Sequence, residues 1–262
     1  MQNKLAKIVI EVGKEVNKRK KNLIKKNQWD GDQLKTEADI FAHKLLVHKL
    51  LKLIKIPIIS EEDSKSHLIL RPKKYWIIDP IDGTRSFVDG YPGWVTQVAL
   101  VEFGVVLNAA IYAPDLDLLY LAEKGKGSTL NGNQLIVKES CEGQVRLIDN
   151  YPNPKGIAEK IMSELPCKEY IESGGISLKI CRVADGTADL FVKDVAVRDW
   201  DVAAPMLVLK EAGGILKKGD GSKFLLSSNF DKNGLIASNS RIVVQSSMTI
   251  MGNSDLINLD IS

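Results

Sequence analysis

The stretch from residue 76 to residue 87, Trp-Ile-Ile-Asp-Pro-Ile-Asp-Gly-Thr-Arg-Ser-Phe, constrains the fold more than any other part of this 262-residue chain. It begins with large apolar residues that are typical of a buried strand. It ends in a turn, because Pro80 fixes its own φ and Gly83 can take φ values that other residues avoid. Asp79 and Asp82 flank this turn, and a hydroxyl and a basic group follow. Such an acidic strand end predicts a site for a divalent cation that holds an anion.

The composition is that of an ordinary soluble globular protein, with 44% hydrophobic and 26% charged residues. The net charge of +3 is too small to indicate a nucleic-acid partner. No apolar run approaches the roughly 20 residues that span a bilayer. Residues 1–24 form a charged amphipathic pattern rather than the apolar core of a signal peptide. We therefore expect a cytoplasmic protein that binds neither a membrane nor nucleic acid.

The cysteine and histidine residues show no metal-binding pattern. An odd number of cysteines without a C-x-x-C pair fits a reducing compartment. We expect the cysteines to be small buried apolar groups, at positions 141, 167 and 181. The histidines at positions 43, 48 and 67 are expected to be solvated or packed side chains.

The first half of the chain reads as two helices followed by a mainly antiparallel sheet. Helical periodicity covers residues 2–26, a polar loop is expected at 27–35, and Thr36 can cap a second helix that Pro57 ends. A short strand at 56–59 leads to an acidic turn, and 64–74 reads as a polar loop. After the opening stretch, strands separated by turn residues predict an antiparallel meander at 95–102, 105–112 and 118–123.

The second half alternates strands and helices. Strands are expected at 145–148, 190–192, 215–217 and 234–237, and helices at 154–165 and about 177–185. A further helix opens at Asp201, has Pro205 in its first turn and ends at a pair of glycines, 213 and 214. We expect one domain over residues 1–245, with halves at 1–140 and 141–245, and a loosely attached tail at 246–262.

Three separated segments place acidic residues at the ends of elements: Glu61, the pair Asp79 and Asp82, and Asp201. Hard divalent cations prefer oxygen ligands, mainly carboxylates and carbonyls. Four converging acids would repel one another unless several cations balanced them. If the segments meet in the fold, the cluster therefore implies two or three Mg²⁺ ions.

Two longer motifs, in this order, resemble the signatures of the inositol monophosphatase family. The first is Asp-Pro-Ile-Asp-Gly-Thr at residues 79–84, followed by Ser-Phe at 86–87. The second is Trp-Asp-Val-Ala-Ala at 200–204, leading to Glu-Ala-Gly-Gly at 211–214. The resemblance covers about residues 1–245. Members of this family are Mg²⁺-dependent, lithium-sensitive phosphatases, so the resemblance implies hydrolysis of a small phosphomonoester by attack of a metal-activated water.

The resemblance also implies roles for single residues. The implied metal ligands are Glu61, Asp79, the backbone carbonyl of Ile81, Asp82 and Asp201. Glu61 resembles the first glutamate of the family's Gly-Glu-Glu motif, although Ser60 stands here in place of that glycine. Asp79 would bridge two metal ions. Residues 29–35 differ from the lysine and Ser-Pro that many members carry beside a third metal ion, which bears on lithium sensitivity.

Backbone N–H groups of Gly83 and Thr84 would bind the phosphate. Thr-x-Ala-Asp at residues 36–39 matches the start of the family's second helix, and Asp39 with Thr84 would orient the attacking water. From the residues alone, Asp39 is better explained as an acid that complements the dipole of its own helix.

The cues to the substrate disagree. Ser177-Leu178-Lys179 resembles bacterial 3′(2′),5′-bisphosphate nucleotidases, in which Lys179 could serve a second phosphate. Asp194 stands where inositol phosphatases carry a glutamate that binds a polyol hydroxyl. The residues around Arg85 look more like a subgroup that contains histidinol-phosphate phosphatases. The three readings stay open: inositol monophosphate, 3′-phosphoadenosine 5′-phosphate or histidinol phosphate.

The fold class that the resemblance implies is α/β (α+β), the layered αβαβα sandwich of the sugar phosphatases, which are commonly homodimers. An alternative of another class is a binding protein that keeps this fold without turnover and uses its basic N-terminal helix on an acidic partner. The complete set of acids in the motifs favours the enzyme.

Overall fold

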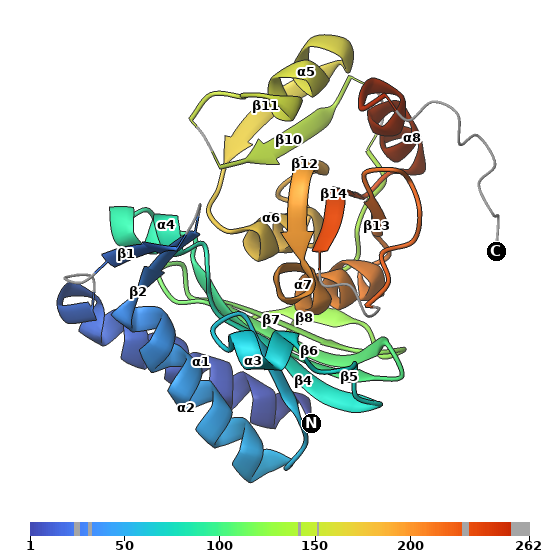
Figure 1. Ribbon diagram of the computed structural model, residues 1–262. Helices are drawn as coiled ribbons and strands as arrows, with labels where there is room; N and C mark the ends of the chain where they lie inside the picture. Colours follow the sequence, from blue (N-terminus) through green and yellow to red (C-terminus); the bar gives the residue numbers. More distant parts are fainter. Residues whose placement is uncertain (24–26, 31–32, 141–142, 151, 227–230, 253–262) are drawn as a thin grey trace.

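The computed structural model describes residues 1–23, 27–30, 33–140, 143–150, 152–226 and 231–252. Helices and sheets alternate in layers (Figure 1). The helices α1 (Gln2–Leu23) and α2 (Glu37–Leu53) cover one face of a seven-stranded sheet, and α6 (Ile176–Ala184) and α7 (Asp199–Glu211) lie between it and a five-stranded sheet. The outer layer is formed by α5 (Ile157–Glu164) and α8 (Arg241–Ile250). The predicted αβαβα sandwich is confirmed.

The seven-stranded sheet follows the chain from one edge to the other, β3 to β9 in order. β3 and β4 are parallel, with the short helix α3 (Ser64–His67) between them, and all later pairs are antiparallel, as the meander predicted. The strands are β3 (Ile58–Ser60), β4 (Lys74–Asp82), β5 (Val95–Glu102), β6 (Val105–Ala113), β7 (Leu118–Glu123), β8 (Ser128–Leu130) and β9 (Asn133–Gln134).

Both faces of this sheet are buried along β4, which explains why this strand is apolar from Tyr75 to Ile78. Trp76 and Ile78 pack against α1 and α2, whereas Tyr75 and Ile77 face the core that contains α6 and α7. Burial on both sides removes the polar alternation that a half-exposed strand would show.

The five-stranded sheet has the order β11-β10-β12-β14-β13. β10 is parallel to both of its neighbours, and the remaining pairs are antiparallel. Its strands are β10 (Val145–Asp149), β11 (Cys167–Glu172), β12 (Leu190–Arg198), β13 (Ile215–Lys218) and β14 (Asp231–Ser238). β11 was not predicted, because its largely polar residues resemble a loop.

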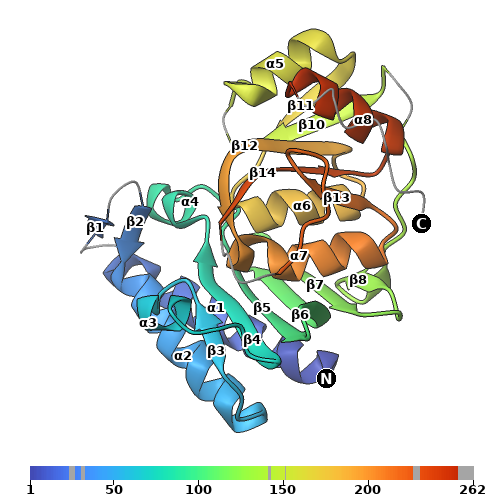
Figure 2. The same ribbon diagram turned by 45° about the vertical axis from the view of Figure 1, so that its right-hand side comes forward.

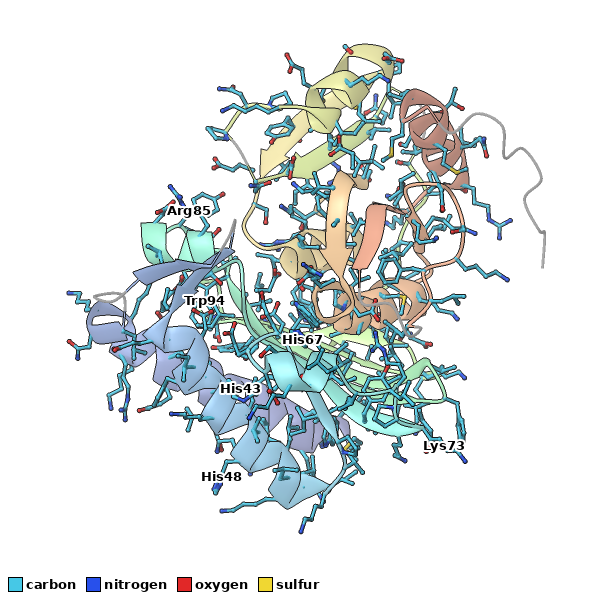
Figure 3. All side chains as sticks on the ribbon, in the orientation of Figure 1. His43, His48, His67, Lys73, Arg85 and Trp94 are labelled. Atoms are coloured by element: carbon cyan, nitrogen blue, oxygen red, sulfur yellow. The ribbon has the colours of Figure 1, made fainter. Side chains whose placement is uncertain are left out.

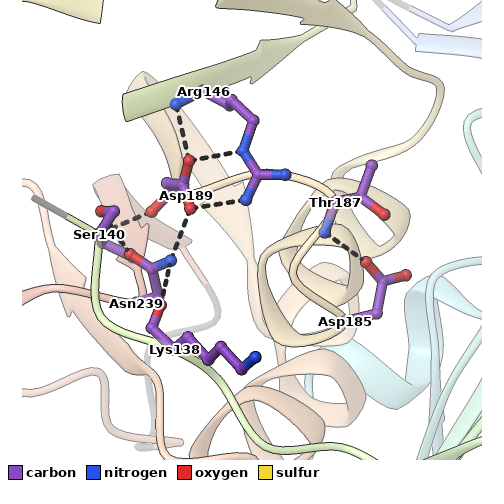
Figure 4. A network of polar contacts seen from close by, with 8 residues as sticks. Lys138, Ser140, Arg146, Asp185, Thr187, Asp189 and Asn239 are labelled. Atoms are coloured by element: carbon purple, nitrogen blue, oxygen red, sulfur yellow. Dashed lines mark hydrogen bonds and ion pairs between the residues drawn. The ribbon is translucent and has the colours of Figure 1, made fainter. Parts of the chain in front are cut away.

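A carboxylate joins the strands of this sheet (Figure 4). Asp189 accepts hydrogen bonds from the backbone N–H and the guanidinium of Arg146, at 2.8 to 2.9 Å, and from Asn239 Nδ2 at 2.7 Å. These bonds and the charge of Arg146 lower the pKa of Asp189 against the effect of its burial. The network links the start of β10, the residue before β12 and the end of β14.

Besides β11, three segments differ from the sequence predictions. The expected loop at 27–35 contains a hairpin of β1 (Asn27–Asp30) and β2 (Gln33–Thr36), and Asp-Gly at 30–31 is a hairpin signal in the sequence. The loop at 64–74 contains α3. The expected tail is wrong for residues 246–250, because they continue α8, which packs on the outer core through Val243 and Met248.

Some predictions fall outside the described residues: the helix end at 24–26, the loop centre at 31–32, Cys141 and the tail at 253–262. Of the other two cysteines, Cys181 is buried and Cys167 is half-buried. Within the described part of the chain, no helix has the length and apolar character needed to cross a bilayer.

Candidate active site

The acids predicted from three segments converge. Asp79 and Asp82 lie at the end of β4, and Asp201 is the third residue of α7. One carboxylate oxygen from each lies within 4.8 Å of the other two. Glu61 follows β3, the parallel neighbour of β4, and its carboxyl group is in hydrogen-bond contact with Asp79. The cluster therefore contains all four acids that the sequence singled out.

A β-bulge allows Asp79 and Asp82 to serve one site. Residues three apart in a regular strand point to opposite faces of the sheet. Here Asp79 pairs with Gln97 and Asp82 with Val95, so β4 has one more residue than β5 over this interval. The extra residue realigns the two side chains. Pro80, which has no N–H to give to a ladder, lies in this interval.

Burial and mutual repulsion raise the pKa values of the acids in this cluster. Burial, followed by the charge of Glu61, raises the pKa of Asp79 well above its usual range. Burial and the charge of Asp201 do the same to the pKa of Glu61. Burial and the charge of Asp82 raise the pKa of Asp201 to about 7. The cluster without metal therefore holds protons near neutral pH, and a bound cation would displace them.

The N-terminus of α6 binds Asp82. The backbone N–H groups of Ile176 and Ser177 donate to its two carboxylate oxygens, at 3.3 and 2.7 Å. Burial raises the pKa of Asp82, and these bonds oppose the rise. The contact needs glycine at position 175, because a Cβ there would lie 2.3 Å from Asp82 Oδ2. Gly83 packs against Gly175 with a φ of 86°, a conformation that favours glycine.

A proline in α7 explains how Asp201 is tied to α6. The carbonyl of Asp201 cannot receive the usual i+4 hydrogen bond, because residue 205 is proline and has no N–H. Ser177 Oγ donates to this carbonyl instead, at 2.7 Å. Gln97 Nε2 in turn donates to Ser177 Oγ at 2.5 Å. Pro205 thus lies beyond the first turn where it was expected, since α7 begins at Asp199.

Asp39 and Thr84 meet, as the resemblance implied. Thr84 Oγ1 lies 3.3 Å from Asp39 Oδ1 and 3.1 Å from the carbonyl oxygen of Ile81. The other oxygen of Asp39 accepts from the backbone N–H and the hydroxyl of Thr36, both at 2.7 Å, which completes the cap of α2. Burial raises the pKa of Asp39. Asp39 therefore both caps its helix and contacts the hydroxyl beside the acidic cluster.

Of the residues that were predicted to contact the substrate, Ser177 and Lys179 are buried and Asp194 is exposed. Ser177 is fully buried, and its hydroxyl is used in the contacts described above. Lys179 is 2% exposed, neither a surface residue nor open to solvent; its Nζ lies 3.3 Å from Asp149 and Asn150. Burial lowers the pKa of Lys179 to about 8. Asp194 is exposed in the irregular part of β12.

Arg85 lies on the outside of α4 (Thr84–Asp89), where Figure 3 labels it. Its side chain is 69% exposed and pairs with Asp89 one turn further along the helix. The residues whose roles the sequence did not reveal are Gln97 and Gly175. Gln97 reads as an ordinary polar residue in an apolar strand, and its pairing with Asp79 is a register that the structure shows and the sequence does not.

The donor set fits a hard divalent cation. Such ions take carboxylate and carbonyl oxygens, and Asp79, Asp82 and Asp201 offer converging carboxylates beside the carbonyl of Ile81. Buried acids that raise one another's pKa are stabilised by a counter-charge, which a cation would supply. The geometry also places a hydroxyl and a further carboxylate, from Thr84 and Asp39, next to this donor set.

The sequence and the fold of this chain are both similar to those of known proteins. Over 216 residues the chain is 34% identical to the 3′(2′),5′-bisphosphate nucleotidase CysQ of Buchnera aphidicola, covering 78% of this chain and 79% of that protein. Over 193 residues it is 33% identical to the putative Nus factor SuhB of Neisseria meningitidis serogroup B, covering 70% and 71%. An IMPase structure from Thermotoga maritima superposes with a TM-score of 0.81 at 25% identity, covering 94% and 96% of the two chains. A sequence model of the inositol monophosphatase family matches residues 1–250, and the chain therefore belongs to the inositol monophosphatase family.

Proposed function

We propose that this phosphatase hydrolyses a small phosphomonoester, such as inositol monophosphate, with Mg²⁺ bound by Glu61, Asp79, Asp82 and Asp201. The observation that supports this most directly is the convergence of acids from three separate segments, with three carboxylate oxygens within 4.8 Å of one another. When bound, Mg²⁺ would supply positive charge for the phosphate oxygens and acidify the attacking water. The number of ions that we propose is two or three, because four acids need more than one divalent charge.

The protein's own groups would orient the reactants. Thr84 Oγ1, held by Asp39 Oδ1 and the carbonyl of Ile81, can accept a hydrogen bond from the attacking water. Asp39 can accept a proton through this hydroxyl, and its raised pKa suits a general base better than that of a solvated acid. The N–H groups at the start of α4, from Gly83 and Thr84, would bind the phosphate oxygens.

A bisphosphorylated nucleoside, such as 3′-phosphoadenosine 5′-phosphate, is the second candidate substrate. The similarity to a bisphosphate nucleotidase and the sequence Ser177-Leu178-Lys179 favour it. Two lysines also gather at the end of β10, where Lys179 and Lys193 lie 3.3 and 3.7 Å from the same oxygen of Asp149. Lys179 is closed to solvent, so Lys193, whose side chain is 20% exposed, is the lysine of this pair that a second phosphate could contact.

One experiment separates the candidates. The purified protein is assayed with Mg²⁺ on inositol 1-phosphate, 3′-phosphoadenosine 5′-phosphate and histidinol phosphate, and kcat/KM is compared. A preference of about a hundredfold, or about 2.7 kcal/mol of transition-state binding, identifies the substrate class. Asp82→Asn serves as the control and should abolish Mg²⁺-dependent phosphate release. Wild-type release by this variant would refute the assignment of the site, and no release from any ester would favour a binding protein.

Two further properties are proposed from the resemblance: inhibition by Li⁺ and a homodimeric state. Assays at increasing LiCl concentration and light scattering coupled to size-exclusion chromatography test them separately. Activity that is insensitive to Li⁺, or a monomer in solution, would show that this chain departs from its family in that property.

A further inference from the structure

Residues 61–73 form a loop that leaves the seven-stranded sheet after β3 and returns to it at β4. The loop begins with Glu61 and contains α3. It lies against the N-terminal end of α7, which carries Asp201 about 140 residues later in the chain. The backbone N–H of Glu61 donates to the carbonyl of Ile78 in β4 at 3.4 Å, whereas Asp201 lies in α7, outside the sheet ladder. Contacts between the loop and α7 therefore join the two segments that carry these proposed metal-binding acids.

His67 connects the two segments. Its Nε2 lies 2.7 Å from the carbonyl oxygen of Ser60, and because a carbonyl can only accept, Nε2 donates. Its ring stacks on Trp200, with centroids 4.5 Å apart and planes 21° apart. Ser60 immediately precedes Glu61, and Trp200 immediately precedes Asp201. Figure 3 labels His67 beside the middle layers of the molecule.

Arg71 makes a second connection from the same loop to the same helix end. Its guanidinium forms an ion pair with Asp199, which is fully buried, and donates to Tyr75 OH at 3.2 Å. The guanidinium also lies 5.7 Å from the centre of the Tyr75 ring. The loop is therefore attached to α7 at two positions, one on each side of the loop residues 68–70.

The partner of His67 is itself held in place. Gln97 Nε2 donates to the carbonyl oxygen of Trp200 at 2.9 Å, and Gln97 pairs with Asp79 across the sheet. Trp200 is 4% exposed. His67 thus stacks on a side chain whose backbone is fixed to the strand that faces Asp79, and the loop takes its position from that strand.

We propose that His67 and Arg71 are positioning residues, which hold the 61–73 loop against α7 so that the carboxyl groups of Glu61 and Asp201 stay close enough to bind metal together. This inference rests on the proposed metal-dependent function. The geometry gives the physical reason, because His67 joins the residue before Glu61 to the residue before Asp201, and Arg71 joins the same loop to Asp199. Without the two attachments, the loop would lose these side-chain contacts with the N-terminal end of α7.

The test measures metal binding directly, without substrate. Mn²⁺ binding to the full chain is followed by electron paramagnetic resonance, and Mg²⁺ activation of phosphate release is measured in parallel. His67→Ala is expected to weaken Mn²⁺ binding at least tenfold and to raise the half-saturating Mg²⁺ concentration similarly. At saturating Mg²⁺, kcat and the KM for substrate should return to within about twofold of wild type. Lys65→Ala, on the exposed surface of α3, is the matched control and should bind Mn²⁺ as wild type does.

Two conservative variants keep one contact each and guard against a failure of His67→Ala to fold. His67→Gln can still donate to Ser60 but cannot stack, and His67→Phe can stack but cannot donate. Each is expected to weaken Mn²⁺ binding about threefold. Unchanged Mn²⁺ affinity in folded His67→Ala, or in both conservative variants, would overturn the inference, as would a fall in kcat that saturating Mg²⁺ does not restore.

The outcome for the wild-type protein separates this inference from the proposed function. If the wild type neither binds Mn²⁺ nor releases phosphate, the proposed function itself fails. If the wild type binds Mn²⁺ and all His67 variants bind it equally well, only the positioning role is refuted. Arg71→Lys adds an independent arm, because it keeps the charge beside Asp199 but loses the planar guanidinium that also reaches Tyr75.

Discussion

Replacing Gly175 by alanine should move Asp82 and thereby damage the site. The backbone at Gly175 has φ −57° and ψ 164°, which alanine also adopts, so the effect is steric rather than conformational. The new Cβ would lie 2.3 Å from Asp82 Oδ2 and 2.7 Å from its Cγ. Carbon atoms approach such neighbours to about 3.5 Å. Asp82 or the start of α6 must therefore move by about 1 Å.

A displacement of this size at a reacting centre can lower the rate about a hundredfold, which corresponds to about 2.7 kcal/mol. The assay is kcat/KM for the preferred phosphomonoester at a series of Mg²⁺ concentrations, with the fraction of folded protein measured by circular dichroism. Part of the loss should appear as a higher Mg²⁺ requirement, because Asp82 is a proposed ligand.

Gly214→Ala is the matched control. Its Cβ would lie 2.2 Å from the Cδ1 of Leu209, a clash at least as close as the one at Gly175. Gly214 follows the far end of α7, which is about 15 Å along the helix from Asp201. The substitution should lower stability and leave kcat/KM per folded molecule unchanged. If Gly175→Ala keeps kcat/KM within threefold of wild type, the contact between α6 and Asp82 does not position this carboxylate for catalysis.

Three further predictions concern the same cluster. Ser177→Ala leaves the carbonyl of Asp201 without its hydrogen-bond donor and should lower the free energy of unfolding in urea by about 1–3 kcal/mol. This loss should be smaller when Pro205 is also replaced by alanine, because residue 205 then has an N–H that can donate to the same carbonyl. An equal loss with and without Pro205→Ala would contradict the explanation. Metal-free protein should lose stability as pH rises from about 4 to 7, because native Asp201, with its pKa raised from 3.8 to about 7, keeps a proton that the unfolded chain has released. The raised pKa of Asp201 corresponds to a loss of about 4 kcal/mol in the free energy of unfolding over this pH range. Urea unfolding in EDTA should show that this free energy falls less steeply with pH in Asp201→Asn than in the wild type. A free energy of unfolding that rises with pH in the metal-free wild type would refute the prediction. Asp39→Asn should lower kcat about 10²- to 10⁴-fold while Mn²⁺ binding, measured by electron paramagnetic resonance, stays near wild type; a large loss of Mn²⁺ affinity would instead make Asp39 part of the metal site.

Local patterns predicted most elements because local physics decides them. Thr36 and Asp39 form the cap that begins α2, and Gly213 with a φ of 95° follows the end of α7. The missed elements are those whose residues carry weak local signals. β11 is largely polar and is held by its parallel neighbour β10. α8 shows its apolar face only when the outer side of the five-stranded sheet is there to receive Val243 and Met248.

In the candidate site, too, some residues could be predicted from the sequence and others could not. Glu61, Asp79, Asp82 and Asp201 could be named from motifs, because metal chemistry demands oxygen ligands and the motif spacing is specific. The burial of Ser177 and Lys179 could not, since a helix residue shows its surroundings only when the neighbouring layer is placed. The use of Ser177 on the carbonyl freed by Pro205 joins two helices across the molecule, and no spacing within either helix indicates it.

The sequence by itself determined which chemical groups are available: an acidic strand end, two further acids at element ends and a glycine turn ahead of a short helix. It did so because strands, caps and turns depend on neighbours a few residues away. Tertiary structure alone decided that these groups meet, that a bulge turns Asp79 and Asp82 toward one site, and that Gly175 lets α6 reach Asp82. It also decided that His67 bridges Ser60 and Trp200, because contacts between distant segments depend on how the layers pack and not on the local pattern of either segment.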